Sequence, residues 1–151
     1  RSLGVKLRLR STKSVVKNKS IILIDDSLVR GTTCYKIVKM LYESGAKEVH
    51  VRIACPEIKF PDFYGVDMPT KKELLAHKKT DIEMCEYIKA KSLKFLSLDG
   101  LYEALEQGKR NNSYPQFSDH YFTGEYPIKP SDNLGELKIT QLSLLSGKSN
   151  N

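Results

Sequence analysis

The chain has 151 residues, of which 40% are hydrophobic and 28% are charged, and these values are ordinary for about one globular domain. Its longest uninterrupted apolar run is the four residues 21–24, which excludes a helix that crosses a membrane. The net charge of +7 arises within the first 19 residues, where seven basic side chains stand without an acid or an aromatic ring, so we expect no nucleic-acid partner.

The N-terminal residues predict extended structure. Residues 4–9 alternate apolar and basic side chains, which is the period of a half-exposed strand. We expect residues 15–16 to continue extended and residues 18–19 to turn into the next strand. Because the chain begins with Arg1 and shows no signal peptide, we expect a piece of a longer protein.

The three cysteines are Cys34, Cys55 and Cys85, and they lie far apart in the sequence. None of the short spacings that mark zinc or iron-sulfur ligands is present. Widely spaced cysteines in a chain without a signal peptide fit a reducing compartment, so we expect a cytoplasmic protein. Cys34 falls on the apolar face of a predicted helix, where core packing is its expected role.

Residues 21–33, with the sequence IILIDDSLVRGTT, organise the rest of the chain. Four apolar residues in succession predict a strand that is buried on both faces, as in a parallel sheet covered by helices. Asp25 and Asp26 end this strand, and a loop rich in hydroxyl groups follows. Apolar residues then recur at three- and four-residue intervals, which predicts an amphipathic helix over residues 31–44 that stops at Gly45.

The end of this strand carries groups that suit a ribose 5-phosphate. Ligands of open α/β sheets bind at the carboxyl ends of strands, where two carboxylates can accept hydrogen bonds from ribose hydroxyls or bind Mg²⁺. The loop supplies backbone N–H groups, a cation and a helix N-terminus, which together make an anion site. Its glycine would let the backbone approach a phosphate closely. The candidate substrate-binding residues are Ser27, Leu28, Val29, Arg30, Gly31, Thr32 and Thr33.

This stretch resembles a known family. An apolar strand, two aspartates and a loop that ends in Gly-Thr-Thr resemble the signature of the type I phosphoribosyltransferases, and the longer IDDSLVRGTT resembles that of the amidophosphoribosyltransferases. The resemblance implies catalytic and Mg²⁺-binding roles for Asp25 and Asp26, and binding of the substrate's 5-phosphate by residues 27–33. It also implies an α/β fold with the parallel sheet of a type I phosphoribosyltransferase, incomplete because this chain would hold only the C-terminal part.

A second strand is predicted over residues 49–53, directly after the helix. Strand, helix and strand with short connections make a βαβ unit with parallel strands. His50 alternates with apolar residues there, and we interpret it as a half-buried sheet residue rather than a catalyst. The following residues 56–70 contain prolines, aromatic residues and a glycine, which indicates an ordered loop packed on the domain. They also resemble the P-x-I-x-x-P-x-x-Y-G-x-D-x-P-T motif of amidophosphoribosyltransferases, which other phosphoribosyltransferases have no reason to share.

Two capping boxes, which begin at Thr70 and Thr80, predict short helices that run to about His77 and Ile88. A short strand is predicted next over residues 93–98.

The strand leads into the last helix of this part of the chain. Asp99 should cap a helix that continues through Leu105 and ends at Gly108. The wording SLDGLYEA across this junction also resembles the amidophosphoribosyltransferases.

The pattern weakens after residue 108. We divide the chain into residues 1–108, the C-terminal part of a phosphoribosyltransferase domain, and residues 109–151, a mainly helical or irregular extension that is partly disordered. Some amidophosphoribosyltransferases bind an iron-sulfur cluster through cysteines, whereas this sequence has Asp62, Ser118 and Tyr121 at those places. The resemblance therefore implies that no cluster forms here.

The resemblance implies the first step of purine synthesis: phosphoribosyl pyrophosphate, glutamine and water give 5-phosphoribosylamine, pyrophosphate and glutamate. The implied partners are phosphoribosyl pyrophosphate, Mg²⁺, ammonia from a glutaminase domain outside this chain, feedback purine nucleotides and further copies in a homo-oligomer. The acids and the loop would act by positioning and charge stabilisation, and we expect the fragment alone to be inactive. Two alternatives remain, another type I phosphoribosyltransferase and a non-catalytic regulator that senses phosphoribosyl pyrophosphate through the same fold.

Overall fold

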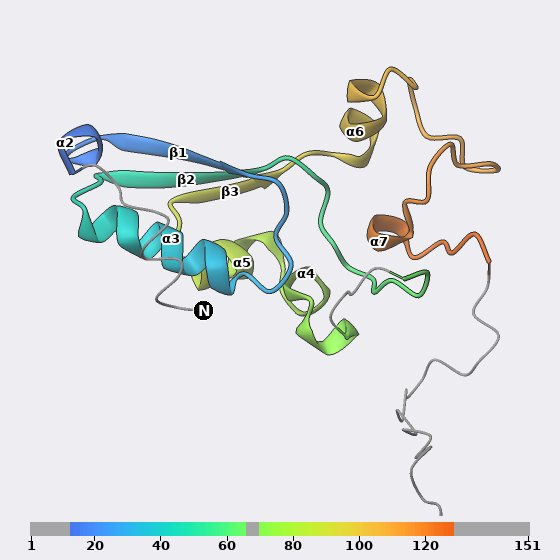
Figure 1. The fold of residues 1–151 in the computed structure, drawn as a ribbon, viewed down its shortest axis with the longest axis horizontal. Coiled ribbons are helices and arrows are strands. Elements are labelled where there is room, and N and C mark those ends of the chain that lie inside the picture. The colour runs from blue at the N-terminus through green and yellow to red at the C-terminus, as the bar shows by residue number, and fades with distance from the viewer. Residues whose placement is uncertain (1–12, 66–69, 129–151) are drawn as a thin grey trace, which may run out of the picture.

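The computed structural model describes residues 13–65 and 70–128 of the chain (Figure 1). A parallel sheet of three strands forms its centre, in the order β1-β2-β3. The strands are β1 (Ser20–Asp25), β2 (Glu48–Ile53) and β3 (Ser92–Phe95). The expected α/β fold with parallel strands is therefore confirmed, and the register places His50 of β2 between Ile22 and Ser92.

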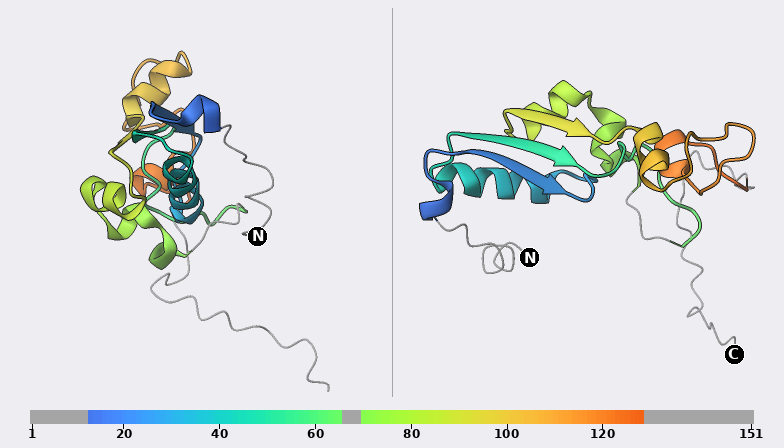
Figure 2. Two further views of the ribbon diagram at one scale, coloured as in Figure 1. Left: turned by 90° about the vertical axis from the view of Figure 1, so that its left-hand side faces the viewer. Right: turned by 90° about the horizontal axis from the view of Figure 1, so that it is seen from above.

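Short helices connect the strands and continue the chain beyond them. They are α2 (Lys13–Val16), α3 (Thr32–Glu43), the 3₁₀ helix η1 (Lys71–Glu73), α4 (Leu75–Lys78), α5 (Asp81–Tyr87), α6 (Leu98–Ala104) and α7 (His120–Thr123). In both Figure 1 and Figure 2, α3 and α5 lie on the same face of the sheet, whereas α6 and α7 lie beyond the carboxyl ends of the strands. Within the described ranges, every helix is too short or too polar to cross a bilayer.

The core lies between this face of the sheet and the helices that cover it. Val38 of α3, Val49 and Val51 of β2, Met84 of α5 and the following Ile88 have no exposed surface. Burial of each such side chain stabilises the fold by about 1.5–3 kcal/mol relative to its exposure. The predicted amphipathic helix is confirmed as α3, and its buried side holds this layer against the sheet.

The apolar run 21–24 is a strand, but the expectation that both of its faces are buried is wrong for the described residues. Ile21 and Leu23 pack against the core, whereas Ile22 and Ile24 are 65% and 72% exposed. Successive strand residues point to opposite faces, and the helices cover only one of them. β1 is also an edge strand of the described sheet, so it pairs only with β2.

The three predictions for the N-terminal residues have different outcomes. Extended backbone at residues 15–16 is wrong, because these residues belong to α2 and Val16 is buried in the core. The predicted turn is confirmed, since Asn18 has a φ of 61° and its N–H donates to the carbonyl of Gly45 at 2.8 Å. The strand expected at residues 4–9 lies outside the described residues.

Both capping boxes are confirmed, but the first does not open one continuous helix. The box that starts at Thr70 opens η1, and the extended backbone of Leu74 (φ −70°, ψ 121°) separates η1 from α4. Leu74 is fully buried, so the break places an apolar side chain in the interior. The second box opens α5, which ends at Tyr87 with Ile88 as its C-cap, as expected.

The last strand and helix differ from their expected ends. β3 ends at Phe95 rather than at Leu98. Ser97, and not Asp99, caps α6, because its Oγ accepts a hydrogen bond from the N–H of Gly100 at 3.0 Å. The boundary between two domains after residue 108 stays a prediction, and the peripheral elements expected after residue 130 lie outside the described residues.

Candidate functional site

A pocket of about 310 Å³ lies at the carboxyl end of β1 and is lined by residues 25–34. It forms because β1 ends at Asp25 and α3 begins at Thr32, so the intervening β1–α3 loop, residues 26–31, must turn the chain beneath the sheet edge (Figure 1). Every site residue that the sequence predicts, from Asp25 to Thr33, lines this one pocket.

The two aspartates retain free acceptor capacity. Asp25 Oδ1 accepts the backbone N–H of Asp26 at 3.0 Å, and Asp26 Oδ1 accepts the hydroxyl of Ser27 at 2.9 Å. The second oxygen of each carboxylate accepts no hydrogen bond from a described residue. Each acid is thus oriented by one oxygen and can offer the other to a diol or to a hard cation such as Mg²⁺.

The backbone amides of the pocket are also available. The N–H groups of residues 29–33 donate to no acceptor among the described residues, whereas the N–H of Leu28 donates to the thiol of Cys55. The first amides of a helix lack an intrahelical partner and carry its positive partial charge, and α3 is twelve residues long. The pocket is therefore lined both by hydrogen-bond acceptors and by hydrogen-bond donors.

The β1–α3 loop is also held by contacts with η1 and α4. The carbonyl of Val29 accepts the backbone N–H of Leu75 at 2.9 Å. Arg30 Nε donates to Glu73 Oε1 at 3.1 Å, and their side chains are 53% and 47% exposed. An exposed pair of this kind contributes at most about 1 kcal/mol, so its main effect is to orient the guanidinium. The sequence predicted Arg30 as a cation of the site, but it did not reveal either partner from residues 73–75.

The two thiols near the pocket are not poised as nucleophiles. Burial, followed by the negative charge of Asp25, raises the pKa of Cys34 to about 11. Burial, followed by the charge of Asp26, raises the pKa of Cys55 to about 11 as well. Since only a thiolate is reactive, both groups stay inert near neutral pH, and packing in the core is the role that the structure gives Cys34.

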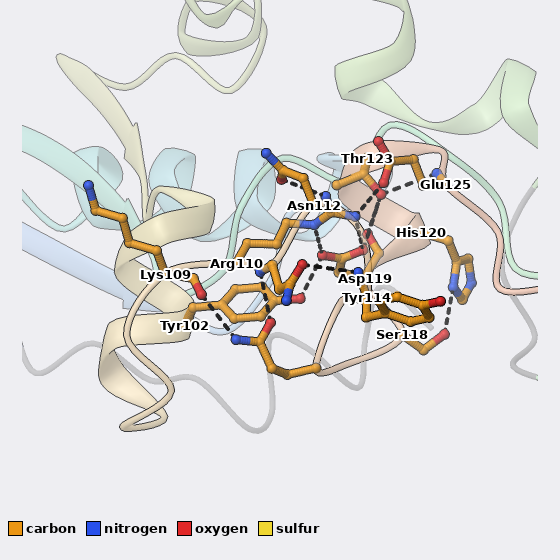
Figure 3. A network of polar contacts seen from close by, with 12 residues as sticks. Tyr102, Lys109, Arg110, Asn112, Tyr114, Ser118, Asp119, His120, Thr123 and Glu125 are labelled. Atoms are coloured by element: carbon orange, nitrogen blue, oxygen red, sulfur yellow. Dashed lines mark hydrogen bonds and ion pairs between the residues drawn. The ribbon is translucent and has the colours of Figure 1, made fainter.

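A second polar region, the Asp119 cluster, lies beyond the sheet and consists of Tyr102, Arg110, Asp119, Thr123 and Glu125 (Figure 3). Asp119 accepts hydrogen bonds from Arg110 at 2.5 and 3.2 Å, from Tyr102 at 2.8 Å and from Thr123 at 3.2 Å. Burial opposes ionisation of Asp119, but these donors outweigh it and hold its pKa below the usual range. The charge is thus fully paired inside the protein.

A histidine beside this cluster connects two distant segments. The hydroxyl of Ser118 lies 3.0 Å from His120 Nδ1, and His120 Nε2 lies 2.8 Å from Asp62 Oδ1. Serine, histidine and aspartate in series resemble a hydrolytic triad. However, the side chains of His120 and Asp62 are 1% and 0% exposed, so no substrate can reach the imidazole. We interpret this series as a structural link between the loop after β2 and α7.

This link also includes the positions at which, by the resemblance, some amidophosphoribosyltransferases have the cysteines that hold an iron-sulfur cluster. Asp62 accepts hydrogen bonds from His120 and from the phenol of Tyr121, and Ser118 contacts the same histidine. Such clusters are held by cysteine thiolates, whereas these positions offer oxygen atoms that already bind His120 or, in the case of Tyr121, Asp62. The donor set does not fit a cluster, and its absence from the protein stays a prediction.

The comparisons with known proteins find relatives that share one name, amidophosphoribosyltransferase. No model of a protein family matches the chain. The chain is 50% identical over 147 residues to the amidophosphoribosyltransferase of Rhizobium etli and 45% identical over 132 residues to the chloroplastic amidophosphoribosyltransferase of Vigna aconitifolia. These matches cover 97% and 87% of the chain but only 30% and 26% of the relatives. The chain thus spans less than a third of their length.

A solved structure agrees with these relatives. The glutamine phosphoribosylpyrophosphate amidotransferase of B. subtilis, complexed with ADP and GMP, superimposes with a TM-score of 0.71 at 39% identity. The superposition covers 84% of this chain and 29% of that one. The resemblance that the sequence showed is therefore confirmed, and it concerns a C-terminal portion of the relatives.

Proposed function

We propose that this chain, a homologue of the C-terminal part of amidophosphoribosyltransferases, supplies the ribose-5-phosphate portion of such an enzyme's active site. The reaction would convert phosphoribosyl pyrophosphate, glutamine and water to 5-phosphoribosylamine, pyrophosphate and glutamate. The observation that carries the proposal is the pocket of residues 25–34, which is lined by carboxylate oxygens and amides that have no partner among residues 13–65 and 70–128.

Each group in the pocket has a separate task in this proposal. Asp25 and Asp26 accept hydrogen bonds from the ribose hydroxyls, and residues 27–33 bind the 5-phosphate chiefly through the amides of residues 29–33. Holding the substrate at these two ends fixes the ring, so that C1 faces the incoming ammonia and the leaving pyrophosphate. Positioning of this kind, with charge stabilisation, can supply much of the rate enhancement without a nucleophilic side chain.

Mg²⁺ fits the acidic end of the pocket. Asp25 and Asp26 each have a free carboxylate oxygen, and Mg²⁺ is usually bound by one or two carboxylates together with water and substrate phosphates. When bound, the ion would neutralise charge on the pyrophosphate of the substrate. The two acids of this chain would then bind the ion and the ribose hydroxyls from the same side.

The source of ammonia, the assembly of the longer protein and its location are further parts of the proposal. We infer that ammonia comes from a glutaminase domain outside this chain and that the longer protein forms a homo-oligomer in the cytoplasm. Since the B. subtilis structure contains ADP and GMP, purine nucleotides are the expected feedback inhibitors. The isolated chain should bind ribose 5-phosphate but form no phosphoribosylamine.

A graft tests the enzymatic part of the proposal. The chain is joined to the N-terminal part of the Rhizobium etli relative in place of its own matching segment, and glutamine-dependent release of pyrophosphate is measured. We expect activity from the graft and none from the graft that carries Asp26→Asn. A folded graft that binds glutamine but releases no pyrophosphate would contradict the proposal.

A further inference from the structure

The peptide between Val29 and Arg30 is fixed by a backbone contact from outside the pocket. The N–H of Leu75 donates to the carbonyl of Val29 at 2.9 Å. In a planar trans peptide the C=O and the following N–H point in opposite directions. With the carbonyl held toward α4, the N–H of Arg30 must point away from α4, toward the open side of the loop.

Gly31 rests on the same support. Its φ of 73° lies in the left-handed region, and a Cβ placed there would come within 2.7 Å of Leu75 Cδ2 and 3.0 Å of Tyr87 Cε1. The absence of a side chain thus lets the loop sit directly on these two residues. Backbone amides around a left-handed residue converge on an anion, so the position of this glycine sets where the donors meet.

We infer that Leu75 and Tyr87 are positioning residues for anion binding by the β1–α3 loop. Leu75 orients the amide of Arg30 through the carbonyl of Val29, and both side chains form the surface on which Gly31 is seated. The sequence placed Leu75 and Tyr87 only in capped helices, 42 or more residues after the loop, with no sign of this role. The inference rests on the proposed function, because it assumes that the loop binds a phosphate.

Position 75 allows the backbone contact to be removed without breaking a helix. Leu75 is the first residue of α4, where proline is well tolerated because its missing N–H has no intrahelical partner. The preceding Leu74 is extended, which is the backbone that a residue before proline prefers. Leu75→Pro therefore removes the N–H and most of the side chain, whereas Leu75→Ala removes only the side chain.

These two variants of the full chain are titrated with ribose 5-phosphate in the presence of Mg²⁺ by calorimetry. Loss of one ordinary backbone hydrogen bond, together with the contact that the proline ring would make with the Val29 carbonyl, predicts that Leu75→Pro binds at least about fivefold more weakly than Leu75→Ala. The amide resonance of Arg30 should also shift in Leu75→Pro and stay in place in Leu75→Ala. If the two variants bind with equal affinity while the wild-type chain binds ribose 5-phosphate, the positioning role of the Leu75 amide is refuted. The proposed function is not affected by that result.

Position 87 provides a test that does not depend on folding of the proline variant. The side chain of Tyr87 is partly exposed and its hydroxyl has no partner among the described residues, so the ring itself is the supporting group. We expect Tyr87→Ala to weaken ribose 5-phosphate binding several-fold, whereas Tyr87→Phe, which keeps the ring, should bind like the wild type. Unchanged binding by Tyr87→Ala would refute the role of the ring, whereas a wild-type chain that binds no ribose 5-phosphate would refute the proposed function as well.

Discussion

The β1–α3 loop and the Asp119 cluster are both polar, yet they differ in how far their groups are engaged. In the loop region, the amides of residues 29–33 and one oxygen each of Asp25 and Asp26 lack a partner among the described residues. In the cluster, both oxygens of Asp119 are hydrogen-bonded, and every buried polar side-chain atom in the described ranges has a partner. Polar groups that are buried and satisfied stabilise a fold, whereas oriented groups left open at a pocket can bind a ligand.

The largest effect should come from removing the charge at the centre of the cluster. Asp119→Ala removes the buried carboxylate that pairs with Arg110 and leaves this guanidinium only Glu125, which is exposed, and Asn112 as partners. Breaking a buried pair by removing one partner costs about 3–5 kcal/mol in the free energy of unfolding. Glu103→Ala, at an exposed position of α6, is the control and should change stability by no more than about 0.5 kcal/mol. Urea unfolding followed by circular dichroism measures both, and equal stabilities would show that the cluster is not structural.

Two glycine substitutions distinguish the effect of the loop's contacts with α4 and α5 from the effect of a left-handed backbone. Gly31→Ala should lower stability by about 2–4 kcal/mol, because it adds close contacts with the side chains of Leu75 and Tyr87 to the strain of a left-handed residue. Gly108→Ala is the matched control, since its φ is 66° and nothing lies within 4 Å of the added Cβ. It should cost only about 1–2 kcal/mol. If both variants lose the same stability in thermal unfolding, the loop does not rest on α4 and α5 as described.

A substitution in the β1–α3 loop should weaken ligand binding without lowering the stability of the fold. Asp26→Asn removes a charged acceptor worth about 1.5–3 kcal/mol, so ribose 5-phosphate should bind about 10- to 100-fold more weakly while the unfolding free energy stays nearly constant. Glu43→Gln on α3 is the control, because it removes an exposed acid whose only described partner is Lys39. Calorimetry that finds the two variants equally affected would mean that the acids of the pocket act only through net charge.

Acidification to a pH below the ordinary range of an aspartate should weaken the Asp119 cluster. Burial raises the pKa of Asp119, but hydrogen bonds from Arg110 and Tyr102 lower it further than burial raises it, so the folded pKa lies below the unfolded value of about 3.9. The stabilisation is therefore present above that value and is lost as the pH falls through the folded pKa. Unfolding free energies between about pH 5 and pH 2 should fall less steeply in Asp119→Asn than in the wild type. If the unfolding free energies of the two proteins fall with the same slope, ionisation of Asp119 does not stabilise the fold.

The sequence predicted the loop better than it predicted the cluster. Residues 21–33 are contiguous, so one local pattern specifies the strand end, the acids and the helix start, and the structure places them as expected. The cluster and the loop's support depend on contacts between distant positions, such as Arg30 with Glu73 and Asp62 with His120. No local periodicity encodes such pairs. For the same reason the exposed face of Ile22 and Ile24 was missed, because burial depends on which elements cover the strand.

The most direct test is a titration of the ¹⁵N-labelled chain with ribose 5-phosphate and Mg²⁺, followed by amide chemical shifts. We expect saturable shifts at residues 27–33, with the amides of Tyr102, Arg110 and Asp119 unchanged. Shifts centred on the Asp119 cluster, or no saturable shift in the loop, would contradict the claim that the open amides beside Asp25 and Asp26 form a sugar-phosphate site.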